Sequence, residues 1–269
     1  MPYLRALAGR RVVVKCGGEV VDDAEQSASL VQDLLLLKMA GIDVVLCHGG
    51  GPQISRMMER LGLAPEFRDG LRVTDAATME VTAMVLLGRV NLELVGLLNV
   101  HGPEAVGVNG TDARMFLVEP ASPELGLVGE VVEVSAAPVE RLLADGYMPV
   151  VASIGMDAQG RPHNINADIA AGQLAAALGA EKFVLLTNVE GLYESFGEAD
   201  SLISEIDPSG LRGLVDGGSL SAGMLPKVDA VLAAVAGGVP RCHILDGRER
   251  HALLLEVFTP EGIGTMVRP

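Results

Sequence analysis

The stretch Val12-Val13-Val14-Lys15-Cys16-Gly17-Gly18 decides the fold of this chain. Three consecutive β-branched residues and a lysine predict a buried strand over residues 11–15, and the two glycines allow a turn that approaches a ligand closely. A lysine beside the free N–H groups of such a turn favours a phosphate ligand. The P-loop motif is excluded, because the lysine precedes the glycines and no Gly-Lys-Ser/Thr follows. Taken alone, the stretch fits a strand-to-turn connection with a solvated lysine equally well.

Strands and helices alternate outward from this stretch. Helices are expected over residues 26–40 and 52–61, around a strand over 42–47, which is the pattern of a parallel sheet with right-handed crossovers. The second half restarts this alternation. It is expected to contain helices over 167–178, 224–236 and 249–257 and strands over 183–187, 241–245 and 264–267. The sequence therefore predicts an α/β fold, a three-layer sandwich with a mostly parallel central sheet.

The middle of the chain is less regular. A helical region is expected from Thr74 or Asp75 to Val100, with a break at Gly88. A helix over 138–145 and a strand over 147–153 precede the second half. Three short strands are expected between, over 105–108, 113–118 and 127–134, the last in a hairpin at a sheet edge. The polar segment 194–222 is predicted to be the loosest part of the chain.

Composition restricts the class of protein. The length of 269 residues lies between that of one large domain and that of two smaller ones. We expect a single domain with an N-lobe over about residues 1–170 and a C-lobe over about 171–269, because the second half restarts the strand–helix alternation without a true linker. A content of 49% hydrophobic and 3% aromatic residues predicts an aliphatic core. The net charge of −15 argues against nucleic-acid and anionic-membrane partners, but not against an anionic small molecule. The spacing of Cys16, Cys47 and Cys242 predicts neither a disulfide framework nor a zinc site. No run of about 18 apolar residues and no apolar leader is recognised, so a cytoplasmic protein is expected.

A second glycine turn, His48-Gly49-Gly50-Gly51-Pro52, lies between the strand over 42–47 and a helix N-terminus. Its free N–H groups and the helix dipole favour a carboxylate or phosphate, although a sharp turn that needs positive φ is the alternative. Because this turn and the Lys15 turn both follow parallel strands, we expect them to share the crevice at the carboxyl ends of the sheet.

The densest polar cluster is His163-Asn164-Ile165-Asn166-Ala167-Asp168. Asn164, Asn166 and Asp168 lie on one side if the segment is extended, and they could bind amide, carboxylate and ammonium groups. Asn166 could instead cap the helix that follows. Arg72 could hold a carboxylate bidentately, although by itself it also fits a surface arginine.

A lysine also opens a later helix, in Ser221-Ala222-Gly223-Met224-Leu225-Pro226-Lys227. A cation in the first turn opposes the helix dipole, so an anion is expected nearby. Lys15 and Lys227 would then form a phosphoryl clamp with Asp168 between them. The segment Thr187-Asn188-Val189-Glu190-Gly191 ends the second buried strand.

Together these motifs resemble the acetylglutamate kinases of the amino acid kinase superfamily. The resemblance rests on Val-Val-Lys-Cys-Gly-Gly, His-Gly-Gly-Gly-Pro-Gln-Ile, Gly-Leu-Arg-Val-Thr-Asp, Asn-Ile-Asn-Ala-Asp and Gly-Met-Leu-Pro-Lys-Val, in the family's order over residues 12–267. It implies ATP-dependent phosphorylation of the γ-carboxylate of N-acetyl-L-glutamate, the second step of arginine biosynthesis.

The resemblance also implies a role for each matching residue. Lys15 and Lys227 would stabilise the transition state, with Asp168 as their organiser. The acyl substrate would contact Gly50, Gly51, Arg72 and Asn164, assisted by Asn166. The nucleotide would lie against Gly17, Gly18, Thr187, Asn188, Gly191, Leu192, Gly223 and Met224. The implied cofactor is ATP with Mg²⁺, the metal being held mainly by the nucleotide phosphates.

The resemblance gives less information about assembly and regulation. The resemblance implies at least a homodimer, and in arginine-inhibited members an N-terminal helix builds a hexameric ring. Residues 1–7 resemble only the last turns of that helix, with Tyr3 at the position of an aromatic residue, whereas 243–258 and 262–266 resemble the inhibited type. Dimer or hexamer, and inhibition by L-arginine, therefore stay open.

Other functions remain as alternatives. A kinase for a carrier-linked aminoadipate or glutamate would favour a basic surface, which the net charge argues against. A non-catalytic protein that senses arginine or nucleotide would have no need of both lysines and Asp168. A dinucleotide-binding oxidoreductase is disfavoured because the glycine turn lacks the G-x-G-x-x-G spacing.

Overall fold

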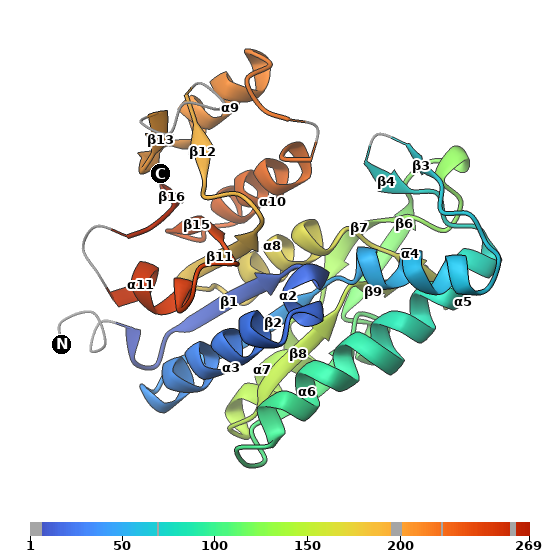
Figure 1. Ribbon diagram of the computed structural model, residues 1–269, viewed down its shortest axis with the longest axis horizontal. Helices are drawn as coiled ribbons and strands as arrows, with labels where there is room; N and C mark the ends of the chain where they lie inside the picture. The colour runs from blue at the N-terminus through green and yellow to red at the C-terminus, as the bar shows by residue number, and fades with distance from the viewer. Residues whose placement is uncertain (1–6, 69, 195–200, 222, 259–261) are drawn as a thin grey trace.

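An eight-stranded sheet forms the centre of the molecule (Figure 1). The computed structural model describes residues 7–68, 70–194, 201–221, 223–258 and 262–269, so Tyr3 and most of the expected N-terminal helical turns lie outside it. The strand order is β14-β16-β15-β11-β1-β2-β8-β5, and neighbours are parallel except β15 and β16. The strands are β1 Arg11–Cys16, β2 Asp43–His48, β5 Ala105–Asn109, β8 Met148–Ala152, β11 Lys182–Thr187, β14 Glu205–Ile206, β15 Cys242–Asp246 and β16 Thr265–Val267. The predicted α/β fold with a mostly parallel sheet is confirmed.

Helices cover both faces of this sheet and make three layers (Figure 1). Because side chains alternate along a strand, Val12 and Val14 of β1 pack into one hydrophobic cluster and Val13 into another. The first cluster joins the sheet to α2 Gly18–Asp22, α3 Ala24–Met39, α4 Gly51–Arg60, α5 Ala76–Val85, α6 Leu92–Asn99 and α11 Ala252–Phe258; the second joins it to α7 Ala137–Ala144, α8 Ala167–Ala177 and α10 Leu225–Ala236. Strand β1, which carries Lys15, is therefore buried on both faces.

The long helical region is interrupted where the sequence predicted a break. A π-helical turn over Leu86–Asn91, which contains Gly88, joins α5 to α6. By length and mean hydropathy of 1.7, the helix Ala76–Asn99 could cross a membrane, although the sequence was expected to contain no such run. Its buried apolar side chains belong to the cluster against the central sheet, which is the usual arrangement of a core helix.

A four-stranded sheet of order β10-β9-β6-β7 lies beside the central sheet. Its strands are β6 Phe116–Pro120, β7 Gly129–Val134, β9 Ile154–Met156 and β10 Pro162–Asn164. The antiparallel β6–β7 pair, with β7 at the edge, confirms the predicted hairpin. The strand expected over 113–118 begins later, because residues 112–114 form a 3₁₀ turn.

Some elements were not predicted. Helix α9, Pro208–Asp216, lies within the segment expected to be loosest; Asp207 caps it by accepting a hydrogen bond from Gly210 N, and Pro208 suits its first turn. The short helix α2 and the hairpin of β3 Phe67–Arg68 and β4 Leu71–Arg72 were also missed. The same is true of the hairpin of β12 Leu192–Tyr193 and β13 Leu202–Ile203, whose strands are too short to show a period.

Candidate active site

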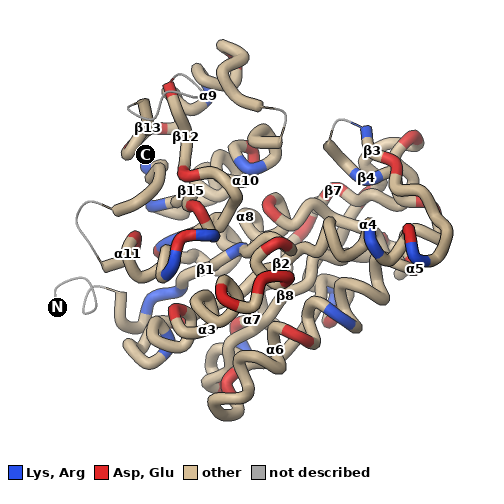
Figure 2. Tube along the Cα trace, in the orientation of Figure 1, with Lys and Arg blue, Asp and Glu red and all other residues tan. Residues whose placement is uncertain are grey.

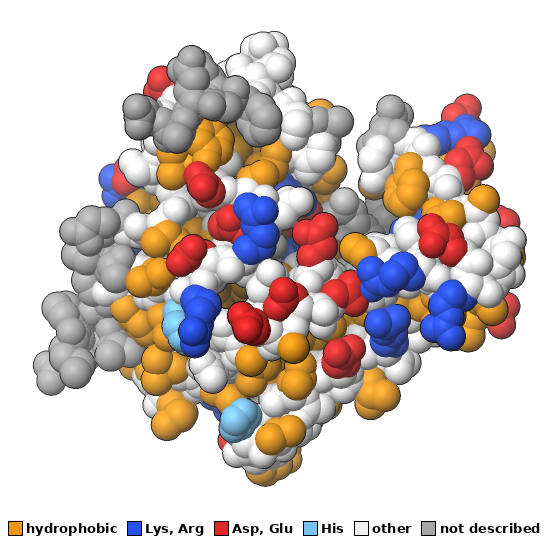
Figure 3. Space-filling view, viewed as in Figure 1, with side chains coloured by type: hydrophobic (Ala, Val, Ile, Leu, Met, Phe, Trp, Pro, Cys, Tyr) orange, Lys and Arg blue, Asp and Glu red, His pale blue; other side chains and the backbone are white. Residues whose placement is uncertain are grey.

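A cavity of about 360 Å³ opens where the carboxyl ends of β1, β2 and β11 meet. Figure 3 shows a notch in the surface between the part of the molecule that contains α10 and the β3–β4 hairpin. Lys227 of α10 and Phe67 of β3 line the cavity from these two sides. The predicted site residues that line it are Lys15, Gly17, Gly18, Gly50, Gly51, Arg72, Asn164, Asn166, Asp168, Thr187, Asn188 and Lys227. One cavity therefore joins both glycine turns, the polar cluster and both lysines.

Two lysines meet at one carboxylate in this cavity. Lys15 Nζ lies 2.7 Å from Asp168 Oδ1 in an ion pair without hydrogen-bond alignment, and Lys227 Nζ donates a 3.1 Å hydrogen bond to Asp168 Oδ2. Burial of Asp168 opposes its ionisation, but the two ammonium groups prevail and hold the pKa of the carboxyl below its ordinary value. The carboxylate thus stays charged at neutral pH, and the trio keeps a net positive charge that faces the cavity.

Close packing of α8 against α10 brings Asp168 to Lys227. Gly172 of α8 lies so near α10 that a Cβ there would be 2.6 Å from the carbonyl oxygen of Ala230. Asp168 and Lys227 lie in the first turns of the two helices, where the dipole favours the carboxylate and opposes the ammonium. Lys227 is therefore held by Asp168, and an anion in the cavity would stabilise it further.

The glycine turns fit together tightly. A Cβ on Gly50 would lie 2.8 Å from Leu86 Cδ2, so lack of space, and not its extended backbone, requires glycine there. Gln53 of α4 donates a 2.6 Å hydrogen bond from Nε2 to the carbonyl oxygen of Gly18, and a Cβ on Gly18 would lie 2.3 Å from Gln53 Oε1. Gln53, 1% exposed, connects the two turns. No role at the site was predicted for Gln53, although it directly follows the glycine-proline run.

Arg72 is buried, so the alternative of a surface arginine is wrong. Its Nη2 donates 2.9 Å hydrogen bonds to Gly51 O and Ser55 Oγ, and its guanidinium carbon lies 4.7 Å from the centre of the Phe67 ring. These contacts fix the plane of the guanidinium at the end of β4. A planar donor group with a fixed orientation beside the Gly50–Gly51 turn suits a carboxylate ligand.

The two asparagines have different partners. Asn166 caps α8 by accepting hydrogen bonds from Asp168 N at 2.9 Å and Ile169 N at 3.2 Å, which confirms the capping alternative. Asn164 donates from Nδ2 to Thr74 Oγ1 at 3.3 Å. Because the cap uses only the side-chain oxygen of Asn166, its amide nitrogen remains available in the cavity.

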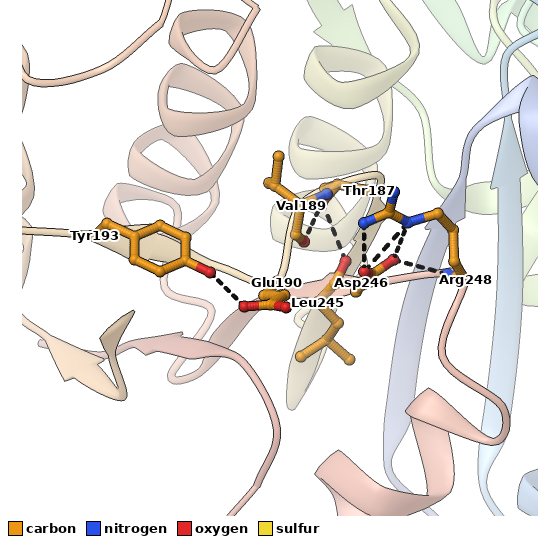
Figure 4. A network of polar contacts seen from close by, with 7 residues as sticks. All are labelled: Thr187, Val189, Glu190, Tyr193, Leu245, Asp246 and Arg248. Carbon is orange, nitrogen blue, oxygen red and sulfur yellow. Dashed lines mark hydrogen bonds and ion pairs between the residues drawn. The ribbon is translucent and has the colours of Figure 1, made fainter. Parts of the chain in front are cut away.

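Figure 4 shows the polar contacts at the end of β11, where Thr187 lies. The Thr187 hydroxyl accepts a hydrogen bond from Val189 N and lies 2.9 and 3.1 Å from the carbonyl oxygens of Val189 and Leu245, to either of which it can donate. These contacts fix the loop, while Asn188 is exposed in the cavity. Arg248, which also lines the cavity and was not predicted, pairs with both oxygens of Asp246 at 2.7 and 2.9 Å. The remaining predicted residues, Gly191, Leu192, Gly223 and Met224, are not among the residues that line the cavity.

Contacts with the core hold three of these residues in place. A Cβ on Gly191 would lie 2.6 Å from Thr265 Oγ1, and Leu192 N donates a 2.8 Å hydrogen bond to the same hydroxyl. Met224, 8% exposed, packs in the hydrophobic cluster around α10. Contact of these residues with a nucleotide stays a prediction.

Known proteins share this sequence and fold. The sequence pattern of the amino acid kinase family matches residues 10–246. The chain is 50% identical to the acetylglutamate kinase of Saccharopolyspora erythraea over all of its length and 90% of that protein, and 46% identical to the chloroplastic acetylglutamate kinase of Arabidopsis thaliana over 99% of its length and 78% of that protein. Among solved structures, N-acetylglutamate synthase from Neisseria gonorrhoeae superposes with a TM-score of 0.88 in complex with coenzyme A and N-acetyl-glutamate and 0.85 with coenzyme A and L-arginine, at 26% identity. The chain spans 61% and 63% of those two synthase chains.

Proposed function

Since the chain belongs to the amino acid kinase family, we propose that it transfers the γ-phosphoryl group of ATP to the γ-carboxylate of N-acetyl-L-glutamate, in arginine biosynthesis. The observation that carries this proposal is the contact of Lys15 and Lys227 with Asp168, in one cavity with both glycine turns. Relatives that match the whole chain at about half identity are acetylglutamate kinases, which supports the choice of acceptor.

The geometry suits phosphoryl transfer to a carboxylate. A carboxylate is already a nucleophile at neutral pH, so the reaction needs no general base. What the protein must do is hold two anions that repel each other and neutralise charge on the transferring group. Lys15 and Lys227 supply that charge, and Asp168 keeps their ammonium groups a fixed distance apart.

We assign the two ends of the cavity to the two substrates. Arg72, Asn164 and the N–H groups of Gly50 and Gly51 would bind N-acetylglutamate, Arg72 through a carboxylate, with Asn166 assisting. The N–H groups of Gly17 and Gly18 would face the phosphates, and the end of β11 with the start of α10 would hold the rest of the nucleotide. In this assignment the N-lobe, to about residue 170, binds the acyl substrate and the C-lobe binds ATP.

The side chains near the reacting groups fit a Mg²⁺ ion whose ligands come mainly from the nucleotide. Among the described residues, no group of three or more His, Cys, Asp or Glu side chains is placed to hold a metal ion, and Asp168 is already paired with two lysines. The phosphate oxygens of the nucleotide would then supply most of its ligands. When bound, Mg²⁺ would neutralise part of their charge.

A coupled assay of ADP release tests the proposed reaction. N-acetylglutamate should be turned over at least about 100-fold more efficiently than glutamate, aspartate or carbamate, because only it fills both the carboxylate and the acyl contacts. Preference for another acceptor would contradict the proposal. The carrier-linked alternative predicts activity only with a carrier conjugate and favours a basic surface. Figure 2 shows Lys and Arg interspersed with Asp and Glu along the chain, and Figure 3 shows the same mixture on one face of the molecule.

We also propose that the enzyme is a homodimer, with the N-lobe at its interface. Met84, Leu87 and Leu92 are 52%, 38% and 67% exposed on the apolar α5–α6 helix, which is unusual for a solvated helix face. Sedimentation should give a dimer that Leu92→Lys weakens, and a monomeric parent protein would contradict the proposal. A hexamer would need the N-terminal residues, of which 1–6 lie outside the described part.

Inhibition by L-arginine is a second proposal, supported by a buried ionic cluster that the transfer reaction does not use. Lys182 Nζ lies 3.2 Å from His243 Nε2, and His243 Nδ1 lies 2.6 Å from Glu256 Oε1. Glu256, 8% exposed, could pair with a guanidinium. Titration with arginine should lower the activity of the parent protein and not of Glu256→Gln. Indifference of the parent protein to arginine would end this proposal.

A cytoplasmic location is proposed on the state of the cysteines. Cys16, Cys47 and Cys242 are all free and buried, as expected in a reducing compartment. One relative is chloroplastic, so cell fractionation is the test.

A further inference from the structure

His48 ends strand β2 directly before the glycine turn, and it is 0% exposed. Its ring has one contact on each nitrogen. Nδ1 lies 3.1 Å from the carbonyl oxygen of Gly49, and Nε2 lies 2.9 Å from Asn91 Nδ2. Asn91, 7% exposed, is the last residue of the π-helical turn between α5 and α6. The transfer reaction described above uses neither side chain.

The proton on the imidazole can be located from these contacts. Asn91 Nδ2 also lies 2.9 Å from the carbonyl oxygen of Val150, which can only accept, so this end of the Asn91 side chain is its NH₂ group. The same NH₂ donates its second hydrogen to His48 Nε2, which must therefore be unprotonated. The neutral ring then carries its proton on Nδ1 and donates it to Gly49 O. Burial keeps the ring neutral, because it lowers the pKa of His48 to about 4.

This bond fixes a peptide plane of the glycine turn. The described chain contains no cis peptide, so in the Gly49–Gly50 peptide the N–H of Gly50 points opposite to the carbonyl that His48 holds. Gly50 is buried and lines the cavity, yet its N–H donates to no group in the described residues. A buried donor without a partner is costly unless a ligand accepts from it.

We propose that His48 and Asn91 are positioning residues that aim the Gly50 N–H at the carboxylate of the acyl substrate. The π-helical turn contributes in two ways. It places Asn91 beside the imidazole, and it packs Leu86 and Val90 against Gly50, where a Cβ would lie 2.8 Å from Leu86 Cδ2 and 3.1 Å from Val90 Cγ2. Without the Nδ1–H bond, three successive glycines would let this peptide flip and turn a carbonyl oxygen toward the anion. The proposal rests on the proposed function only for the identity of that anion.

Nitrogen-15 NMR of the histidine-labelled protein tests the tautomer directly. His48 should be the Nδ1–H form between pH 6 and 8, although free imidazole favours Nε2–H. Asn91→Ala should shift His48 toward Nε2–H. Exposed His101 serves as the control histidine. Finding His48 as Nε2–H or as imidazolium in the unaltered protein would overturn the proposal, whatever the substrate is.

Two matched variants test the consequence for binding. In His48→Asn the side-chain amide lies where Nδ1 was, so it can still donate to Gly49 O; in His48→Gln the amide lies where Nε2 was and cannot. We expect kcat/KM for N-acetylglutamate to fall about 100-fold in His48→Gln and less than about fivefold in His48→Asn, with the KM for ATP unchanged in both.

If His48 served only to fill space in the core, kcat/KM would fall equally in the two variants, and that result would overturn the proposal. Thermal melts of both variants, with His101→Asn as the control, show whether they fold. If neither folds, the tautomer of the unaltered protein decides. Lack of turnover of N-acetylglutamate by the parent protein would contradict the proposed function and leave the tautomer test intact.

Discussion

Lys15 lies on the central strand β1, between β11 and β2, whereas Lys227 lies in the first turn of α10. The side chain of Lys15 is 9% exposed and that of Lys227 is 19% exposed. Backbone hydrogen bonds on both sides fix the first lysine, while the second depends on how α10 packs against α8. The two charges that we propose act on one phosphoryl group are therefore positioned by different means, one by the sheet and one by a helix contact.

Replacement of the sheet lysine should have the largest effect. In Lys15→Arg the planar guanidinium does not fit the space of a compact ammonium, and β1 cannot move to accommodate it, so we expect kcat to fall about 1000-fold. Steady-state kinetics measures this, with Lys38→Arg, remote from the cavity, as the matched control. Near-normal turnover would remove Lys15 from the catalytic role.

The helix lysine should tolerate the same change better. Lys227→Arg should lower kcat about 100-fold, because the first turn of α10 and the more exposed side chain can adjust. If this variant loses more activity than Lys15→Arg does, the sheet does not hold Lys15 more rigidly than the helix contact holds Lys227.

At the acyl end, Arg72→Lys should act on binding. We expect the KM for N-acetylglutamate to rise about 30-fold with little change in the KM for ATP, because lysine cannot keep both the Phe67 contact and a bidentate carboxylate contact. Arg60→Lys, on the exposed end of α4, is the control. An effect confined to ATP would count against the assignment of this end of the cavity.

The helix contact itself can be altered through Gly172. Gly172→Ala should push α8 from α10 at Ala230, lower the free energy of unfolding by about 1–3 kcal/mol and reduce kcat about tenfold. Gly213→Ala in α9 is the control, since a Cβ there meets nothing within 4 Å. Equal melting temperatures for the two variants would show that the helix packing does not position Lys227.

The smallest effect concerns pH and the buried histidine. In the folded protein the pKa of His48 is about 4, below its ordinary 6.5, so protons bind preferentially to the unfolded chain as the pH falls below 6.5. The stability that the neutral His48 ring contributes is fully present above pH 6.5, and it is lost as the pH falls toward 4. Between pH 7.5 and 5, the parent protein should lose about 1–2 kcal/mol more than His48→Asn does. Parallel stability curves would mean that His48 is not buried as a neutral ring.

Local sequence patterns were sufficient to predict most of the central sheet and the helices that follow its strands. Runs such as Val12–Val14 and glycines after strands identify a parallel sheet, because a strand buried on both faces must be continuously apolar. They also placed Lys15, Asp168 and Lys227 near one edge, since the ends of parallel strands and the first turns of their helices meet there. The cap role of Asn166 could be predicted because it depends only on neighbours in the sequence.

Features that depend on distant contacts could not be predicted in this way. The burial of Arg72 requires the β3–β4 hairpin, whose strands are two residues long and show no period. Helix α9 was missed because its one strong signal, Asp207 before Pro208, lies among polar residues typical of loops. Nothing in the sequence around Gln53 or Asn91 indicates their partners, Gly18 and His48, which are 35 and 43 residues away.

The bond from Gln53 to Gly18 also couples the binding of the two substrates. It joins the turn assigned to the acyl substrate to the turn assigned to ATP, so ordering one turn restricts the other. Each substrate should therefore bind more tightly in the presence of its partner, and by thermodynamic linkage the factor must be the same in both directions. An enzyme built this way favours the ternary complex over either half-filled site and thereby limits wasteful hydrolysis of ATP.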